Sequence, residues 1–214
     1  MRISLAQSFS TAVRPSARVM ETAAMFGVGV DEAHRITIVP PIGLELPSPG
    51  VVFITGPSGG GKSTLLRLIH DACASAGTRT YFVNNEEPLR EVPLVDSFDL
   101  PLRETMELLA LAGLGEAFLM LRTPAQLSDG QRSRLRLAIT MARAERGDVI
   151  LVDEFGAPLD RLTARLLARH VKRWTAKVRI TFIAATTHDD LLESLEPDLL
   201  IYKGIGDEME IAAR

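Results

Sequence analysis

The stretch Gly56-Pro57-Ser58-Gly59-Gly60-Gly61-Lys62-Ser63-Thr64 decides the fold of this chain. It fits the phosphate-binding pattern G-x-x-x-x-G-K-[ST], in which glycines let successive backbone N–H groups surround phosphate oxygens. The apolar run 51–55 before it predicts a buried strand, and residues 62–74 after it have the periodicity of an amphipathic helix. Strand, loop and helix in this order predict a site for the phosphate chain of a nucleotide.

Two side chains in this phosphate loop (residues 56–64) have expected roles. Lys62 is placed to reach the β- and γ-phosphates, and the Ser63 hydroxyl is placed to ligate Mg²⁺. The helix that follows presents its positive dipole end to the same anion. An incidental lysine in a glycine-rich turn is the alternative, but it accounts for neither the strand nor the helix.

Length and composition indicate one globular domain. The chain has 214 residues, 46% of them hydrophobic, and a net charge of −3. That charge gives no general footprint for nucleic acid, which would have to bind at a local basic patch. No apolar run approaches the roughly 20 residues of a membrane span. The single cysteine, Cys73, indicates a packing role in a reducing compartment, so we expect a cytoplasmic protein.

We expect a terminal extension over residues 1–20 and a single domain over residues 21–214. The extension contains Arg2, Arg14 and Arg18 together with several serines and no acidic residue. This composition loosely matches an organelle transit peptide, but a frayed and disordered terminus is the preferred interpretation.

Strand and helix patterns alternate along the chain, which predicts an α/β fold with a mostly parallel sheet and antiparallel edge strands. Strand-like runs occupy 36–39, 51–55, 80–83, 149–152, 180–184 and 199–202, and helical patterns occupy 62–74, 128–146, 161–174 and 189–195. The helical patterns 102–112 and 116–121 have no strand between them, which predicts a small helical lobe at about 97–146. The prolines of residues 40–49 indicate turns between early edge strands.

A second motif, Leu127-Ser128-Asp129-Gly130-Gln131, opens the helix predicted over residues 128–146. Ser128 is a favourable N-cap, and Gln131 three residues later completes a capping box. The start of that helix exposes free N–H groups to an anion. Taken alone, an ordinary helix cap is the preferred interpretation of this signature segment (residues 127–131).

A third motif is the apolar strand 149–152, which ends in Asp153 and Glu154. Asp153 would lie beside the phosphate loop and organise Mg²⁺, and Glu154 would accept a proton from an attacking water. Two carboxylates at a strand end are commonly the start of a solvated loop. The phosphate loop earlier in the chain favours the catalytic interpretation here.

Asp160 and His188 are two further candidates. Asp160 follows a short turn and could also be the N-cap of the helix 161–174. His188 comes just after the strand 180–184, at the sheet edge where open α/β sheets bind ligands, and could hydrogen-bond the γ-phosphate. His34, His70 and His170 have no such placement, and we interpret them as surface or packing residues.

The order of these motifs resembles the ABC ATPase family along nearly the whole chain. Residues 153–160, Asp-Glu-Phe-Gly-Ala-Pro-Leu-Asp, match that family's Walker B and D-loop spacing without a gap. The resemblance implies an α/β P-loop fold and a homodimer, formed head to tail on ATP binding, with two ATP molecules and Mg²⁺ between the protomers. Ser128, Gly130 and Gln131 would contact the γ-phosphate bound to the partner, and Asp160 would couple the two sites.

The same resemblance calls for an aromatic residue stacked on adenine, and Phe26 is the candidate. The sequence also departs from the family pattern. Asp129 replaces a glycine, Phe155 replaces a proline, and no glutamine lies between residue 84 and the lobe, where the family has its Q-loop. Asp96 is the nearest substitute, able to reach Mg²⁺ or its water. The competing polar residues are Asn84, Asn85, Glu86 and Glu87.

Three function classes fit these features. Residues 25–29, 153–155 and 186–188 are most similar to a soluble branch of the family fused to a predicted acetyltransferase domain, which favours a non-transport ATPase with a soluble, acetyltransferase-like partner. The alternative is the ATP-binding motor subunit of a transporter. A DNA-maintenance head domain ranks third, because no heptads lie between residues 63 and 127 and the chain is mildly acidic.

Overall fold

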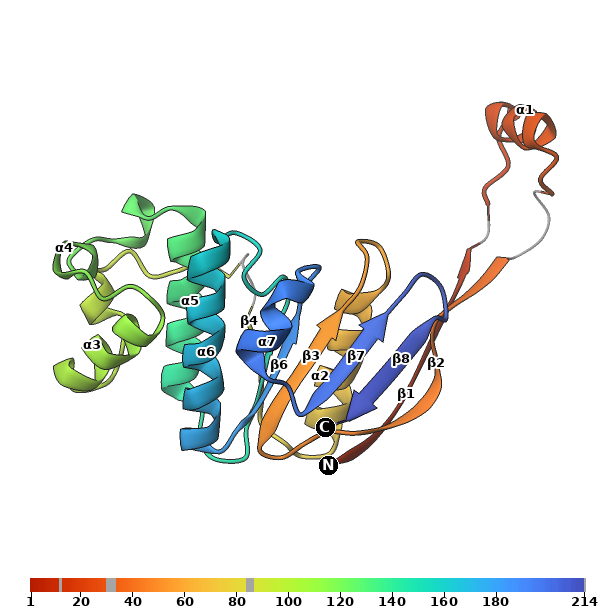
Figure 1. Ribbon diagram of the computed structural model, residues 1–214. Helices are drawn as coiled ribbons and strands as arrows, with labels where there is room; N and C mark the ends of the chain where they lie inside the picture. The colour runs from red at the N-terminus through yellow and green to blue at the C-terminus, as the bar shows by residue number, and fades with distance from the viewer. Residues whose placement is uncertain (12, 30–33, 84–86, 214) are drawn as a thin grey trace.

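The computed structural model describes residues 1–11, 13–29, 34–83 and 87–213 and is built around a six-stranded sheet (Figure 1). The first five strands in the sheet order run parallel, and the last is antiparallel to its neighbour. In spatial order they are β4 (Thr80–Val83), β5 (Val149–Val152), β6 (Thr181–Ala185), β3 (Gly50–Thr55), β7 (Leu199–Lys203) and β8 (Met209–Ala213). The predicted α/β class with a mostly parallel sheet is confirmed.

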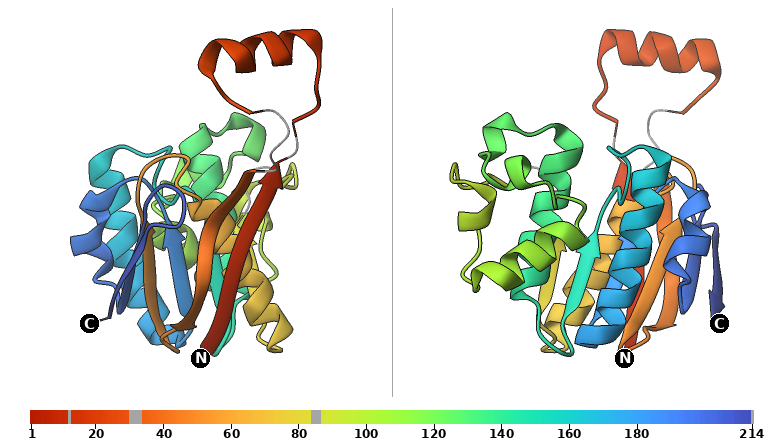
Figure 2. Two further views of the ribbon diagram at one scale, coloured as in Figure 1. Left: turned by 90° about the vertical axis from the view of Figure 1, so that its right-hand side faces the viewer. Right: turned by 60° about the vertical axis from the view of Figure 1, so that its left-hand side comes forward.

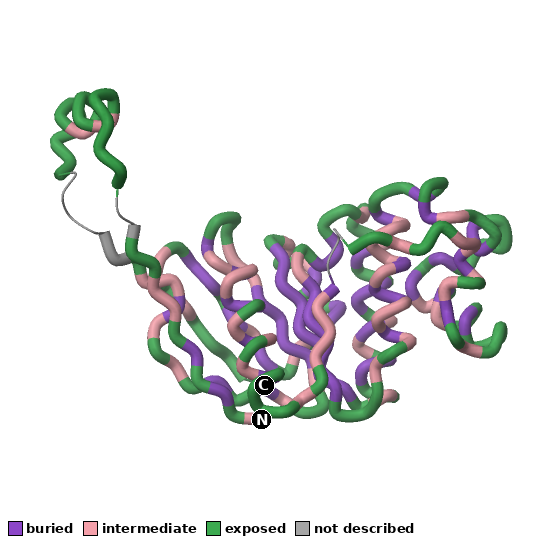
Figure 3. Tube along the Cα trace, turned by 180° about the vertical axis from the view of Figure 1, so that it is seen from behind, coloured by how far each residue is buried: buried purple, intermediate pink, exposed green. Residues whose placement is uncertain are grey.

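Both faces of this sheet are buried, because alternate residues of β3 belong to different cores. On one face of the sheet, Val51 and Phe53 pack against the helices α5 (Asp129–Arg143) and α6 (Arg161–Val178). On the other face, Val52 and Ile54 pack against α2 (Lys62–Ser75). A strand that is apolar at every position is what a sheet covered on both sides requires. Figure 3 shows the buried residues concentrated in these strands and helices.

Residues 2–11 form a strand, so the terminal extension expected over residues 1–20 is wrong for its first half. This strand, β1 (Arg2–Thr11), pairs antiparallel with β2 (His34–Glu45) in a separate two-stranded sheet. Ile3 and Leu5 alternate with polar residues and lie in the same core as α2. Their period of two is a strand signal, and it outweighs the basic, serine-rich composition around it.

The prolines at 40 and 41 are also placed differently from the expected turns, because they lie inside β2. The pairing with β1 shifts register between Leu5 and Gln7, opposite this segment. Proline donates no N–H to a ladder and is tolerated at bulges and edges, so an irregular two-stranded sheet can accommodate both residues.

The helix α1 (Ala17–Phe26), which the sequence analysis does not predict, connects β1 to β2. It stands away from the rest of the molecule (Figures 1 and 2), and none of its residues is buried. Local interactions define its ends, because Ser16 Oγ accepts a hydrogen bond from Val19 N at 3.2 Å and Gly27 adopts a φ of 63°.

A third core lies where the sequence places the helical lobe. It joins Leu135 and Ala138 of α5 to α3 (Leu102–Leu111), α4 (Ala117–Met120) and the short turn η1 (Leu94–Asp96), and the turn η2 (Pro124–Gln126) precedes Leu127 of the same core. The last helical segments, η3 (Asp189–Leu191) and α7 (Leu192–Leu195), follow β6. Figure 1 shows the lobe at the end of the molecule opposite β1 and β2.

Cys73 gives a simple test of the packing beneath α2. It has no exposed surface, and burial raises the pKa of its thiol to about 11. A raised pKa leaves roughly 0.1% of the thiol ionised at pH 8, and only the thiolate reacts. We expect a thiol reagent at pH 8 to leave the folded protein unmodified for hours and to label one thiol per chain promptly in urea. Rapid labelling without urea would contradict this packing.

Candidate functional site

The phosphate loop lies at the carboxyl end of the central strand β3 and leads directly into α2. Gly61 is the N-cap of that helix with a φ of 93°, and Gly56 has a φ of 141°. A Cβ added to Gly56 would overlap the backbone oxygen of Lys203, the last residue of β7. Gly56 thus combines a positive φ with close backbone contact, and a Cβ on Gly61 would lie 2.5 Å from Ile38 Cγ2, so only glycine fits both positions.

A cavity of about 380 Å³ opens over this loop and brings several predicted residues together. Ser58, Lys62 and Ser63 line one side of it, and Asp153 and Glu154 line another. The loop follows β3 and the two carboxylates follow β5, with β6 between these strands. The carboxyl ends of parallel strands thus bring residues about 90 positions apart in sequence into one phosphate cavity.

Lys62 is buried in this cavity with its ammonium turned back onto the loop. Its Nζ donates hydrogen bonds to Gly56 O at 2.9 Å and to Pro57 O at 2.7 Å. Burial lowers the pKa of Lys62 below its usual value, although the nearby charges of Asp153 and Glu154 favour the ammonium form. A bound phosphate oxygen would supply the strong acceptor that these neutral carbonyls only partly replace.

Glu154 is exposed at the rim of the cavity and has an unusual backbone conformation. Its φ is 51°, in the left-handed region that non-glycine residues rarely occupy. Glu154 N donates to Asp153 Oδ1 at 3.0 Å, and the next residue, Phe155, donates its N–H to Ala185 O at 2.9 Å. The strained residue is therefore held on both sides, as is common where backbone strain orients a functional group.

Phe155, which stands where the family has proline, explains how this turn is fixed. Its side chain is buried and meets the ring of Phe182 edge-on, with ring centroids 5.6 Å apart. Such aromatic pairs contribute about 0.5–1.5 kcal/mol beyond their burial. The phenylalanine thus anchors the chain immediately after Glu154.

The donors around the cavity fit a Mg²⁺ ion held together with phosphates. Ser63 and Asp153 both line it, and the described residues contain no cluster of three or more histidine, cysteine or acidic side chains. Mg²⁺ at phosphate sites takes one or two carboxylates, a hydroxyl, waters and phosphate oxygens, so one carboxylate and one hydroxyl are sufficient.

The signature segment forms the capping box that the sequence predicts. Ser128 Oγ accepts a hydrogen bond from Gln131 N at 3.3 Å, and Gln131 Oε1 accepts one from Ser128 N at 2.9 Å. Asp129 pairs with Arg132 on the same exposed turn. These residues do not line the phosphate cavity of their own chain, so any phosphate that they contact would have to belong to a second molecule.

Gly130 is buried because the turn after Glu154 packs against it. A Cβ at this position would lie 2.7 Å from Pro158 O and 3.0 Å from Leu159 Cδ2. We therefore expect Gly130→Ala to lower the free energy of unfolding by about 1–3 kcal/mol, measured by urea denaturation. Ser133→Ala on the same helix is the control and should change it by less than about 0.5 kcal/mol. An alanine at 130 that stabilises the protein would contradict this packing.

Asp160 caps α6 rather than lining the phosphate cavity. Its carboxylate accepts hydrogen bonds from Thr163 Oγ1 at 2.6 Å and Thr163 N at 3.0 Å, which hold the pKa of Asp160 below its usual value. His188 is half-buried, and its backbone N–H donates a hydrogen bond to Thr186 Oγ1 at 3.2 Å. His188 does not line the cavity either, although the preceding residue, Thr187, does.

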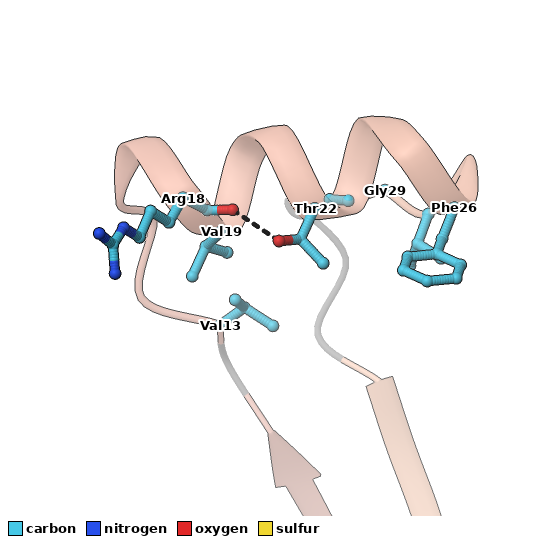
Figure 4. A pocket seen from close by; sticks show the side chains of 8 residues that line it. Val13, Arg18, Val19, Thr22, Phe26 and Gly29 are labelled. Atoms are coloured by element: carbon cyan, nitrogen blue, oxygen red, sulfur yellow. Dashed lines mark hydrogen bonds between the residues drawn. The ribbon is translucent and has the colours of Figure 1, made fainter.

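Two candidates lie away from the phosphate cavity. Phe26 is 78% exposed on α1, where it lines a separate apolar hollow of about 440 Å³ with Val13 and Val19 (Figure 4). Asp96 is exposed in the helical lobe and does not line the phosphate cavity. Neither residue lines the phosphate cavity.

Of the polar residues that compete with Asp96 for the Q-loop position, the structure describes only Glu87. Asn84, Asn85 and Glu86 lie outside the described residues. Glu87 is exposed, and its backbone oxygen accepts a hydrogen bond from Arg136 Nε at 3.0 Å. Sequence reasoning missed Thr186 and Thr187, which line the cavity. Their position at the end of the strand between the loop and Asp153 was the available signal.

Comparisons with known proteins identify the family. The sequence pattern of the ATPase family associated with various cellular activities (AAA) matches residues 52–205. The sulfate/thiosulfate import ATP-binding protein CysA of Thermosynechococcus vestitus is 31% identical over 199 residues, 76% of this chain and 56% of that protein. The chain belongs to this ATPase family, and it is of the ABC type. It therefore binds and hydrolyses ATP.

Other relatives agree with this assignment. CysA of Gloeobacter violaceus is 32% identical over 209 residues, 79% of this chain and 58% of that protein. CysA of Escherichia coli is 30% identical over 192 residues, 72% of this chain and 50% of that protein. The ABC-type chain spans about half the length of the curated relatives it matches.

Solved structures confirm the ABC-type fold. The ATP-binding cassette MJ0796, a dimer bound to ADP and phosphate, has a TM-score of 0.65 at 18% identity and covers 98% of both chains. CbiO1 of Clostridium perfringens, part of the transporter complex cbiONQ, has a TM-score of 0.60 at 18% identity and covers 81% of both chains. In the described part of this ABC-type chain, no helix has the length and apolar character of a membrane span.

Proposed function

We propose that the chain is the ATP-binding motor subunit of an ABC transporter. The observation that carries this proposal is the identity of about 30% with several import ATP-binding proteins. These relatives favour the transporter alternative over the non-transport interpretation, and none of them is described as an acetyltransferase fusion. The partner would then be a membrane-embedded subunit on a separate chain, with this domain on the cytoplasmic side.

In this proposal two copies close head to tail on ATP. The dimeric cassette of the same fold supports this arrangement. Lys62 and the N–H groups of the phosphate loop would bind the phosphates of one ATP. The exposed helix start at Ser128 of the second copy would donate N–H groups to the terminal phosphate, which explains why the signature segment does not line its own cavity.

Hydrolysis would rest on Glu154 as the general base. Its carboxylate stands at the cavity rim, where it can accept the proton of a water attacking the γ-phosphate. Ser63 and Asp153 would hold Mg²⁺, which supplies positive charge to the phosphate oxygens when bound. His188 would hydrogen-bond the γ-phosphate, and Asp160 would couple the two sites from the turn that packs on Gly130. Phe26 has no role in this mechanism, because it lies away from the cavity.

A soluble partner remains the second candidate because of one sequence feature. Residues 84–101 contain no glutamine, whereas ABC motor domains carry one there to couple ATP to a membrane partner. Glu87 or Asp96 would have to replace it. A domain freed from that coupling would fit a cytosolic enzyme complex instead.

One experiment separates the two candidates. Tagged Glu154→Gln with ATP and Mg²⁺ is captured from detergent-solubilised native cells, and co-eluting proteins are identified by mass spectrometry. Lys62→Ala, which should not close on ATP, is the matched control. We expect a polytopic membrane protein that elutes with Glu154→Gln only. A soluble enzyme in its place, with no membrane protein, would overturn the transporter proposal.

A further inference from the structure

Lys203, the last residue of β7, is a lysine with no exposed surface. Its Nζ donates hydrogen bonds to three backbone oxygens, those of Gly204 at 2.8 Å, Gly206 at 2.7 Å and Glu208 at 3.3 Å. An ammonium has three N–H donors, so each one is satisfied. The turn between β7 and β8 is therefore wrapped around this buried charge.

The phosphate loop rests directly on the same turn. A Cβ on Gly60 would lie 2.8 Å from Lys203 O and 3.0 Å from Gly204 O, and one on Gly56 would lie closer still to Lys203 O. Contacts this short show that the two backbones are in direct van der Waals contact. The conformation of the turn therefore determines the position of the phosphate loop, and the hydrogen bonds of Lys203 determine the conformation of the turn.

The side chain of Lys203 also passes beneath the start of α2. Its Cε would lie 3.7 Å from a Cβ placed on Gly61, the N-cap of that helix. The ammonium is one bond farther, so it lies within about 5 Å of that position. Its charge therefore adds to the positive end of the helix that faces the phosphates.

No carboxylate pairs with this ammonium among the ion pairs of the described residues. Burial lowers the pKa of Lys203 below its usual value, while Asp207 and Glu208, farther along the turn, favour its charged form. A charge that is buried and not directly neutralised acts at longer range than one in water.

We propose that Lys203 is a positioning residue of the nucleotide site, which fixes the loop from below and attracts the phosphate chain without touching it. Binding of a triphosphate would bring negative charge toward a cation that the fold has already desolvated. The effect should grow with the number of phosphates on the ligand. It concerns ATP binding itself and holds whichever partner the ATPase drives.

The test compares Lys203→Met, which removes the charge, with Lys203→Arg, which keeps it. ATP, ADP and adenosine dissociation constants are measured by calorimetry, and the rate of a single turnover is measured at saturating ATP. We expect Lys203→Met to weaken ATP binding by about tenfold or more, ADP binding by less and adenosine binding not at all. Lys203→Arg should stay within about threefold of the wild type, and the single-turnover rate should change little in either variant.

Lys177→Met, an exposed lysine near the end of α6, makes the same change in net charge and should bind ATP normally. Wild-type ATP affinity in Lys203→Met would overturn the proposal. An equal loss of ATP affinity in the Met and Arg variants would also overturn it, and so would an equal loss of affinity for ATP and adenosine. Either result would mean that Lys203 acts through packing and not through its charge. If Lys203→Met does not fold, Lys203→Gln replaces it, since the amide can still donate to the turn. Unchanged ATP affinity in that variant would reject the proposal equally.

Discussion

Replacing Glu154 by glutamine should slow ATP hydrolysis by about 10²- to 10⁴-fold while ATP still binds. Glutamine has the same shape as glutamate but cannot accept the proton of the attacking water. The phosphate loop and Lys62, which hold the phosphates, are untouched by the change. The ATP-bound state should therefore accumulate, and the dimer should be visible as a doubled mass in light scattering with ATP and Mg²⁺.

The control for this variant is Glu210→Gln, an exposed glutamate on the edge strand β8 that does not line the phosphate cavity. It should hydrolyse ATP at the wild-type rate and return to monomer. Equal turnover in Glu154→Gln and the wild type would remove Glu154 from the role of general base. A variant that hydrolyses slowly yet stays monomeric with saturating ATP would instead contradict the head-to-tail dimer.

A second substitution separates the chemistry of Glu154 from the strain in its backbone. Glycine adopts a φ of 51° without steric cost, whereas glutamate does so at a cost of about 1–2 kcal/mol. Glu154→Gly should therefore be inactive but as stable as the wild type, or slightly more stable, in thermal unfolding. This combination is the expected sign of a residue kept for function rather than for folding.

The phosphate loop and the two carboxylates could be predicted because each is a local pattern placed by a simple rule. A strand that is apolar at every position lies inside a sheet covered on both faces, and parallel strands bring their carboxyl ends to one edge. Residues 56–64 and 153–154 needed nothing more. Thr186 and Thr187 follow from the same rule, since their strand lies between the other two.

The N-terminal region shows where such patterns give weaker signals. Ile3 and Leu5 do alternate with polar residues, but two apolar positions are a short signal beside a basic composition. The helix α1 was not predicted, although Val19, Ala23 and Phe26 recur at the i, i+4, i+7 spacing of an amphipathic helix and Ser16 and Gly27 are ordinary capping residues. Phe26 was therefore judged by its residue type alone and not by its position.

The contacts between the phosphate loop and Lys203 could not be predicted from the sequence at all. They depend on β7 pairing with β3 in a register that brings Tyr202 opposite Thr55, which ends both strands at the same height. No local pattern encodes the partner of a strand 150 residues away. The left-handed backbone of Glu154 is similar, because the surrounding packing imposes it on a residue with no preference for it.

Replacing Lys62 by methionine should weaken ATP binding by about 10²-fold or more. Each hydrogen bond from an ammonium to a charged phosphate oxygen contributes about 1.5–3 kcal/mol, and Lys62 is placed to make one or two of them. Methionine keeps the methylene chain that packs in the loop. ATP should then no longer raise the thermal unfolding temperature at concentrations that raise it by several degrees in the wild type.

The ligand-free stability of this variant should stay close to that of the wild type. Lys62 gains two hydrogen bonds to loop carbonyls, but burial lowers its pKa, which means that the fold disfavours its charge when no phosphate is present. The two effects oppose each other. Lys177→Met, with the same loss of charge at the surface, should keep the full ATP-induced shift. A Lys62→Met protein that still shows this shift would mean that the loop binds phosphate through its backbone alone.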